Sequence, residues 1–225
     1  MDDLELMATW VPLTGQRLVE AGCGAAELAR RLVHRHPGTT VVGLEVDARQ
    51  HALNLASDAP PGLSFAAAGA EAIPFPDASF DGALMLKSLH HVPLDLMDRA
   101  LAEMRRVLVP GGWLYVSEPV YAGALNEIVR LFNDEGEVRA AAQAALDRAI
   151  ASGAWVQAAE QRFELPVRYA DFADFERRMI QVSFAERRLD DALRAAVRAR
   201  FERHRGPDGA HFVRPMHARL VRTMA

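Results

Sequence analysis

The chain of 225 residues carries the sequence VEAGCGAAE at residues 19–27. An apolar run at 18–21 leads directly into it, and residues 27–33 have the composition and periodicity of a helix. Glycines at positions 22 and 24 let the backbone turn tightly and approach a ligand without Cβ atoms in the way. The stretch therefore predicts a strand, a tight turn and a helix, with the turn suited to hold a small molecule.

Strand-like and helix-like segments alternate after this turn. Strands are expected over 18–21, 39–44, 63–67, 80–86 and 113–117, with helices over 27–33, 48–56 and 94–108. The connections are short, and the breaks fall at proline and glycine clusters. Such alternation selects a parallel, doubly wound α/β sheet with helices on both faces.

The part of the chain after residue 120 has a different character. Residues 121–160 indicate two helices with a break near 133–136, and we expect residues 120–160 to form a helical lid inserted after the fifth strand. Apolar side chains of this lid could face the pocket or simply pack on the sheet: Leu125, Ile128, Leu131, Phe132 and Trp155. A strand over 161–169, two helices over 171–205 and a closing strand over 211–223 complete the pattern, with Pro215 favouring a bulge or an edge position.

These segments predict one Rossmann-like domain over 1–225 with a mostly parallel sheet of seven strands. Residues 17–119 are its expected cofactor-binding core, 120–160 its lid, and 161–225 its closing strands and helices. The chain is 50% hydrophobic and 25% charged, as in ordinary globular domains.

The composition also limits the partners. A net charge of −4 gives no reason to expect nucleic acid, and no apolar run approaches the roughly 20 residues of a membrane span. A single cysteine, Cys23, excludes an intramolecular disulfide and favours a reducing compartment. The acidic N-terminus does not resemble a signal peptide. We expect a cytoplasmic monomer or homodimer with neither a membrane nor a nucleic-acid partner, and no metal site.

The charges around the glycine turn discriminate between cofactors. Glu45 ends the second strand 25 residues after Glu20, where an acid in this fold class accepts hydrogen bonds from ribose hydroxyls. Glu27 stands three residues after Gly24, in the first turn of the helix, where its charge would repel a pyrophosphate. S-adenosylmethionine (AdoMet) has an ammonium, a sulfonium and no phosphate, so this pattern favours AdoMet over NAD.

Residues 17–119 resemble the class I AdoMet-dependent methyltransferases, in particular their small-molecule, type 11-like group. The resemblance rests on VEAGCG (19–24), VGLEVD (42–47), IPFPDASFD (73–81), LHHV (89–92) and RRVLVPGGWL (105–114). It implies that Glu20 holds the methionine ammonium, Glu45 the ribose and Val46 the adenine face. The full implied cofactor-binding set is Glu20, Gly22, Cys23, Gly24, Glu45, Val46, Gly69, Ala70, Glu71, Met85 and Leu86.

Two positions depart from the family pattern. Ala26 stands where a third glycine is common, which is a small change. Gly69 stands where the family usually has an aspartate that contacts the adenine amine. Adenine must then be held by backbone groups or by Glu71.

The resemblance implies AdoMet-dependent methyl transfer to a small-molecule acceptor. His90 and His91 follow the fourth strand and are candidate general bases, although a pair in this place more often caps a loop and packs beneath the cofactor. Two rival functions stay open: an AdoMet-binding module without transferase activity, which Gly69 would fit, and an NAD-dependent reductase. Residues 151–225 hold 14 basic and 10 acidic side chains, and their paired arginines favour a solvated helix face over an anion-binding patch.

Overall fold

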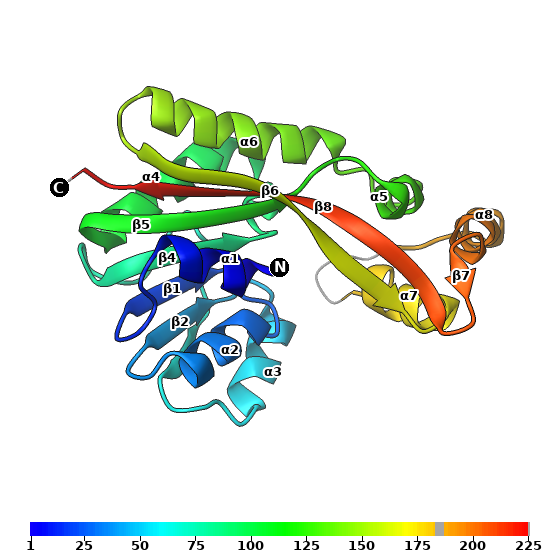
Figure 1. Cartoon of the computed structure of the whole chain (residues 1–225), viewed down its shortest axis with the longest axis horizontal. Helices are drawn as coiled ribbons and strands as arrows, with labels where there is room; N and C mark the ends of the chain where they lie inside the picture. Colours follow the sequence, from blue (N-terminus) through cyan, green and yellow to red (C-terminus); the bar gives the residue numbers. More distant parts are fainter. Residues whose placement is uncertain (183–186, 225) are drawn as a thin grey trace.

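The computed structural model describes residues 1–182 and 187–224. Its sheet has the strand order β3-β2-β1-β4-β5-β8-β6, and a short β7 pairs with β8 (Figure 1). The strands are β1 (Arg17–Ala21), β2 (Thr40–Leu44), β3 (Leu63–Ala66), β4 (Phe80–Leu86), β5 (Leu108–Pro119), β6 (Val156–Tyr169), β7 (Arg205–Gly206) and β8 (Gly209–Arg222). The first five are parallel, β8 is antiparallel to β5, and β6 is antiparallel to β8. The predicted doubly wound, mostly parallel α/β fold is confirmed.

Eight α-helices lie among the described residues. They are α1 (Asp3–Trp10), α2 (Glu27–Arg35), α3 (Ala48–Ala56), α4 (Met97–Val107), α5 (Ala124–Val129), α6 (Gly136–Ala151), α7 (Phe172–Met179) and α8 (Asp191–Glu202), with single 3₁₀ turns at Leu89–His91 and Leu94–Leu96. The sequence did not predict α1, which a capping box formed by Asp2 and Glu5 begins. Strand β6 begins five residues before the predicted boundary at 161.

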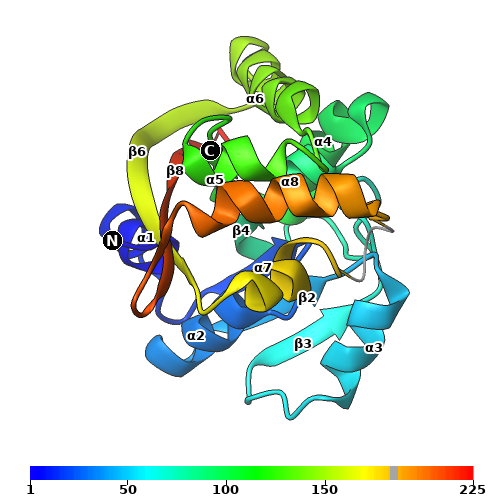
Figure 2. The same ribbon diagram turned by 90° about the vertical axis from the view of Figure 1, so that its right-hand side faces the viewer.

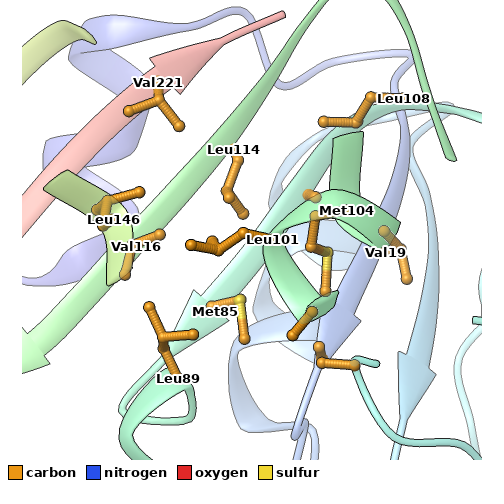
Figure 3. Close-up of a cluster of buried hydrophobic side chains, with 14 of the residues drawn as sticks. Val19, Met85, Leu89, Leu101, Met104, Leu108, Leu114, Val116, Leu146 and Val221 are labelled. Carbon is orange, nitrogen blue, oxygen red and sulfur yellow. The ribbon is translucent and has the colours of Figure 1, made fainter. Parts of the chain in front are cut away.

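One face of the sheet packs against α4 and α6. The apolar stripe of α4, including Leu101 and Met104, meets Val19 of β1 and Leu114 of β5 (Figure 3). Leu146 of α6 joins the same cluster, because the small side chains along that helix allow close packing. The structure differs here from the expected lid: α6 lies over the sheet with α4, and Trp155 belongs to the same core.

The opposite face of the sheet is covered by α1 and α2. Leu4 and Met7 of α1 and Leu32 of α2 pack against Leu18 and other inward-facing strand residues. The hydroxyl of Tyr115 donates a hydrogen bond to Asp3 Oδ1 at 3.0 Å, which ties α1 to β5. The two layers thus leave the carboxyl ends of the parallel strands as the open edge.

Strands β6 and β8 extend beyond the end of β5 and carry a helical cover over that edge, made of α5, α7 and α8 (Figures 1 and 2). Its core contains Leu125 and Ile128 of α5 and an aromatic group: Tyr169, Phe172, Phe175, Phe201 and Phe212. Pro215 is tolerated within β8 because its backbone polar groups face away from β6. Its carbonyl accepts a hydrogen bond from the Val120 N–H, just past the end of β5, so the missing N–H of Pro215 would have pointed to the same side and no hydrogen bond to β6 is lost. No described helix has the length and apolar character needed to span a membrane.

Candidate cofactor and acceptor site

A cavity of about 940 Å³ opens between the carboxyl ends of the parallel strands and the helical cover. This volume lies at the upper end of the range typical for small-molecule sites. All eleven residues that the sequence implied for the cofactor line it, and so do His90 and His91. The structure therefore brings the whole predicted set to one place.

The two glycines of the first turn serve different purposes. Both have left-handed backbone, with φ of 68° at Gly22 and 53° at Gly24. A Cβ on Gly22 would come within 2.8 Å of the Ser88 Cβ, so packing against the end of β4 requires glycine there. A Cβ on Gly24 would meet no described atom within 4 Å, which leaves the backbone open on the cavity side.

Glu20 ends up as a buried carboxyl group facing the cavity. Only 4% of the residue is exposed, and its Oε2 has no hydrogen-bond partner in the described part of the chain. Burial raises the pKa of Glu20 to about 8, and the charge of Lys87 opposes part of this rise. A buried polar atom without a partner is rare in folded proteins, and here it suits a cationic ligand.

Glu45 is held in a fixed orientation by two backbone donors. The Gly24 N–H donates to its Oε2 at 2.8 Å, and the Asp47 N–H donates to its Oε1 at 2.9 Å. Each carboxylate oxygen can accept a further hydrogen bond. The group is thus positioned to take a pair of hydroxyls without moving.

Glu71 occupies the space that a side chain at position 69 would fill. A Cβ built on Gly69 would collide with both carboxylate oxygens of Glu71. The carboxyl group of Glu71 therefore occupies the space that the family's aspartate at position 69 would fill. Sequence comparison position by position shows only the missing aspartate.

Three members of the predicted set have restricted roles. Met85 is fully buried, and its side chain belongs to the hydrophobic core (Figure 3). Val46 is 76% exposed at the mouth of the cavity. Burial, with the nearby charges of Glu20 and Glu45, raises the pKa of the Cys23 thiol to about 12, so it stays protonated.

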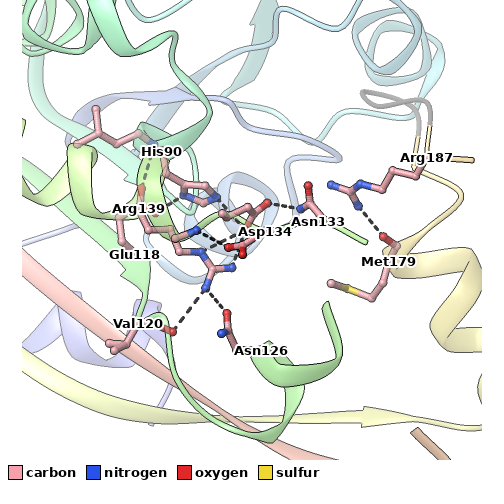
Figure 4. A network of polar contacts seen from close by, with 12 residues as sticks. His90, Glu118, Val120, Asn126, Asn133, Asp134, Arg139, Met179 and Arg187 are labelled. Atoms are coloured by element: carbon pink, nitrogen blue, oxygen red, sulfur yellow. Dashed lines mark hydrogen bonds and ion pairs between the residues drawn. The ribbon is translucent and has the colours of Figure 1, made fainter. Parts of the chain in front are cut away.

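His90 is anchored from beneath by Glu118 (Figure 4). Its Nδ1 contacts Glu118 Oε2, and the other oxygen of Glu118 accepts from the Leu89 N–H at 2.9 Å. The Nε2 of His90 lies 3.8 Å from Glu135 Oε2. Burial and the neighbouring His90 charge lower the pKa of His91 to about 4, so its ring is neutral at pH 7.

Residues 19–116 match the family model described as a methyltransferase domain. Over these residues the chain is similar to a class I AdoMet-dependent methyltransferase domain, and its cofactor is AdoMet. The match supports the methyltransferase interpretation over the NAD-dependent reductase.

Two curated relatives resemble about half of this chain. A phthiotriol/phenolphthiotriol dimycocerosates methyltransferase of Mycobacterium ulcerans is 37% identical over 121 residues, which are 49% of this chain and 40% of that protein. A fatty-acid O-methyltransferase of Mycolicibacterium smegmatis is 33% identical over 118 residues, 49% of this chain and 40% of that protein. The chain spans about two fifths of the length of these relatives.

A solved structure extends the likeness in fold to the whole chain. The SAM-dependent methyltransferase from Methanosarcina mazei superposes with a TM-score of 0.64 over 100% of this chain and 99% of its own, at 15% sequence identity. The second half of the chain, which the family model does not reach, thus also follows a known fold.

The cavity also has a group of arginines that the sequence did not indicate: Arg139, Arg178, Arg187 and Arg214. Arg139 pairs with Glu135 at 2.6 Å and donates to Asn126 Oδ1 at 3.0 Å (Figure 4). These arginines belong to no motif and come from four separate segments, so only the folded chain reveals them together.

Other polar groups contribute less to the cavity. The ligating atoms of His90, His91 and Glu135 lie within 4.8 Å of one another, a grouping that could hold a cation, but Glu135 is already paired with Arg139. Two other histidines, His211 and His217, do not line the cavity and pair with Asp208 and Glu160.

Proposed function

We propose that this chain transfers the methyl group of AdoMet to a small-molecule acceptor. One observation carries the proposal. Three carboxyl groups lie near the carboxyl ends of three adjacent strands along one cavity: Glu20 in β1, Glu45 just after β2 and Glu71 in the loop after β3. Their order matches the three polar parts of AdoMet: the ammonium, the ribose hydroxyls and the adenine amine.

Each of the three acids has a feature that suits the group of AdoMet assigned to it. Glu20 is buried with an unpartnered oxygen, so an ammonium would supply the charge that the site lacks. Glu45 is oriented by two backbone N–H groups and keeps acceptor capacity for two hydroxyls. Glu71 fills the place of the usual adenine-contacting aspartate. Gly69 therefore no longer favours the rival function of a degenerate binding module.

The correct positioning of the acceptor and the cofactor supplies most of the rate of methyl transfer. AdoMet provides a methyl group on a cationic sulfur, which is already an activated leaving group. The cavity walls need to hold the acceptor in line with that methyl and to exclude water. We assign residues 17–119 to cofactor binding and the cover of α5, α7 and α8 to enclosing the acceptor.

His90 is the better placed of the two histidines to act as a base. Glu118 holds the imidazole through Nδ1, which leaves Nε2 as the atom that can receive the proton of an acceptor hydroxyl or amine. As the acceptor atom gains the methyl group, its proton passes to Nε2. His91, with a pKa of about 4, is a much weaker base at neutral pH.

The test combines binding with turnover. Calorimetry should detect binding of S-adenosylhomocysteine (AdoHcy) and none of NADH. Incubation with methyl-labelled AdoMet and a panel of small hydroxyl, amine and acid acceptors should give a labelled product with at least one of them. Binding of AdoHcy without acceptor-dependent label transfer would support the non-catalytic module, and binding of NADH alone would contradict both.

A further inference from the structure

The charges that line the cavity are separated along its length. The described lining residues from segments up to and including β4 and the loop after it hold seven acids against two permanent cations: Asp2, Asp3, Glu20, Glu27, Glu45, Asp47 and Glu71, with Arg31 and Lys87. The described lining after β5 reverses this balance, with four arginines and one acid, Glu135. The cationic cofactor suits the first region, and an anion suits the second.

Arg214 is the central group of the basic region. It lies in β8 opposite Leu165 of β6, and both residues line the cavity, as cross-strand neighbours on one face do. Strands rather than loops hold it, so its position is built into the sheet. Its charge interacts with those of Arg139, Arg178 and Glu135.

The guanidinium group of Arg214 has no hydrogen-bond or ion-pair partner among the residues that the structure describes. The nearby acids are engaged elsewhere: Glu135 pairs with Arg139 at 2.6 Å, and Asp174 pairs with Arg178 at 3.2 Å. Burial lowers the pKa of Arg214, with the charges of Arg139 and Arg178 adding to this effect. A partly buried cation without a counter-charge destabilises the empty protein, and such groups are retained where a ligand uses them.

We propose that Arg214 binds an anionic group, a carboxylate or a phosphate, of the methyl acceptor. The inference rests on the proposed function, because it names the acceptor class for the same cavity. Arg139 and Arg178 add favourable charge around the bound anion while keeping their own protein partners. The same positive surroundings, and the ion pair of Glu135 with Arg139, make this region unfavourable for a metal cation.

The test measures binding of matched acidic and neutral probes to protein saturated with AdoHcy, in a buffer low in chloride. The probes are benzoate with benzamide, 4-hydroxybenzoate with 4-hydroxybenzamide, and phenyl phosphate with phenol. At least one acid should bind about 10- to 100-fold more tightly than its neutral partner, as expected for charge-assisted hydrogen bonds. The stronger of the carboxylate and phosphate preferences identifies the group.

Three variants assign this preference to Arg214. Arg214→Gln should abolish it, Arg214→Lys should keep part of it, and Arg162→Gln should leave it intact. Arg162 is the matched control because it is exposed on the neighbouring strand β6 and does not line the cavity. Arg214→Gln should also raise the melting temperature of the empty protein by about 2–4 °C, since it removes an uncompensated cation.

The outcomes separate this inference from the proposed function. Wild-type protein that binds AdoHcy but binds acid and neutral probes equally, or binds no acid, would overturn the role of Arg214. An acid preference that survives Arg214→Gln would do the same. Failure of wild-type protein to bind AdoHcy would instead count against the proposed function.

Discussion

Replacing Glu20 with glutamine tests the cofactor site where its chemistry is most unusual. The substitution keeps the size of a buried side chain and removes the charge that the cofactor ammonium needs. A hydrogen bond to a charged group contributes about 1.5–3 kcal/mol, so AdoHcy should bind about 10- to 100-fold more weakly to Glu20→Gln above pH 8.

The pH dependence gives a sharper expectation. Because the pKa of Glu20 is about 8 in the empty protein, most molecules carry a neutral Glu20 at pH 7. Binding the ammonium requires the carboxylate, so a proton leaves as AdoHcy binds. The affinity of the parent protein should rise by up to about tenfold per pH unit between pH 6 and 8 and then level off. In Glu20→Gln this dependence should disappear.

Stability of the empty protein should change in the opposite direction. The pKa of Glu20 is raised above its unfolded value of 4.5, so the native state holds the proton more tightly than the unfolded state. The resulting stabilisation is complete below pH 4.5 and is lost as the pH rises through about 8. The loss is on the order of 5 kcal/mol from the difference between the two pKa values. Glu20→Gln should therefore be more stable than the parent at pH 9.

Calorimetry in buffers of different ionisation enthalpy measures both the affinity and the released proton, and melting curves from pH 5 to 9 measure the stability. Glu164→Gln is the control, since Glu164 is exposed on β6 and does not line the cavity. Equal AdoHcy affinity in Glu20→Gln and parent, or binding without proton release near pH 7, would refute the role given to Glu20.

Three further substitutions test neighbouring parts of the site. Glu71→Ala should weaken AdoHcy about tenfold but leave S-inosylhomocysteine, which lacks the adenine amine, unaffected; equal losses for both ligands would argue against an amine contact. Gly22→Val should lower the melting temperature even without cofactor, because left-handed backbone and the nearness of Ser88 both disfavour a side chain; an unchanged melting curve would contradict this. With an acceptor that must lose a proton, His90→Gln should lower turnover about 10²- to 10⁴-fold at nearly constant AdoHcy affinity, while His91→Gln should stay within about threefold; the reverse order would exchange their roles.

The sequence predicted the first half of the fold and the grouping of Glu20, Glu45 and Glu71 around one cavity because both depend on local signals. Each parallel strand is a short apolar run bounded by turn residues, and each motif stands at the end of such a run. Parallel strands bring their carboxyl ends to one edge, so residues as distant as Glu20 and Glu71 meet in one cavity. For the parallel strands and the cavity at their carboxyl ends, the local sequence pattern and the topology were sufficient for the prediction.

The remaining features depend on contacts that sequence patterns do not encode. Glu71 takes the place of a side chain at Gly69 only because the loop turns back between them. We expected helix α6 to lie over the pocket, but its alanines pack on the sheet. The sequence pattern of such a helix does not show which of the two surfaces it covers. Arg214 is one of many arginines in the second half of the chain, and only the register of β8 against β6 turns it toward the cavity.

A crystal structure of the protein with AdoHcy would test the cofactor site most directly. We predict the amino group within hydrogen-bond distance of the Glu20 carboxylate, the ribose hydroxyls on Glu45 and the adenine amine on Glu71. A nucleoside bound elsewhere in the cavity, with these three acids left without ligand contacts, would contradict this prediction.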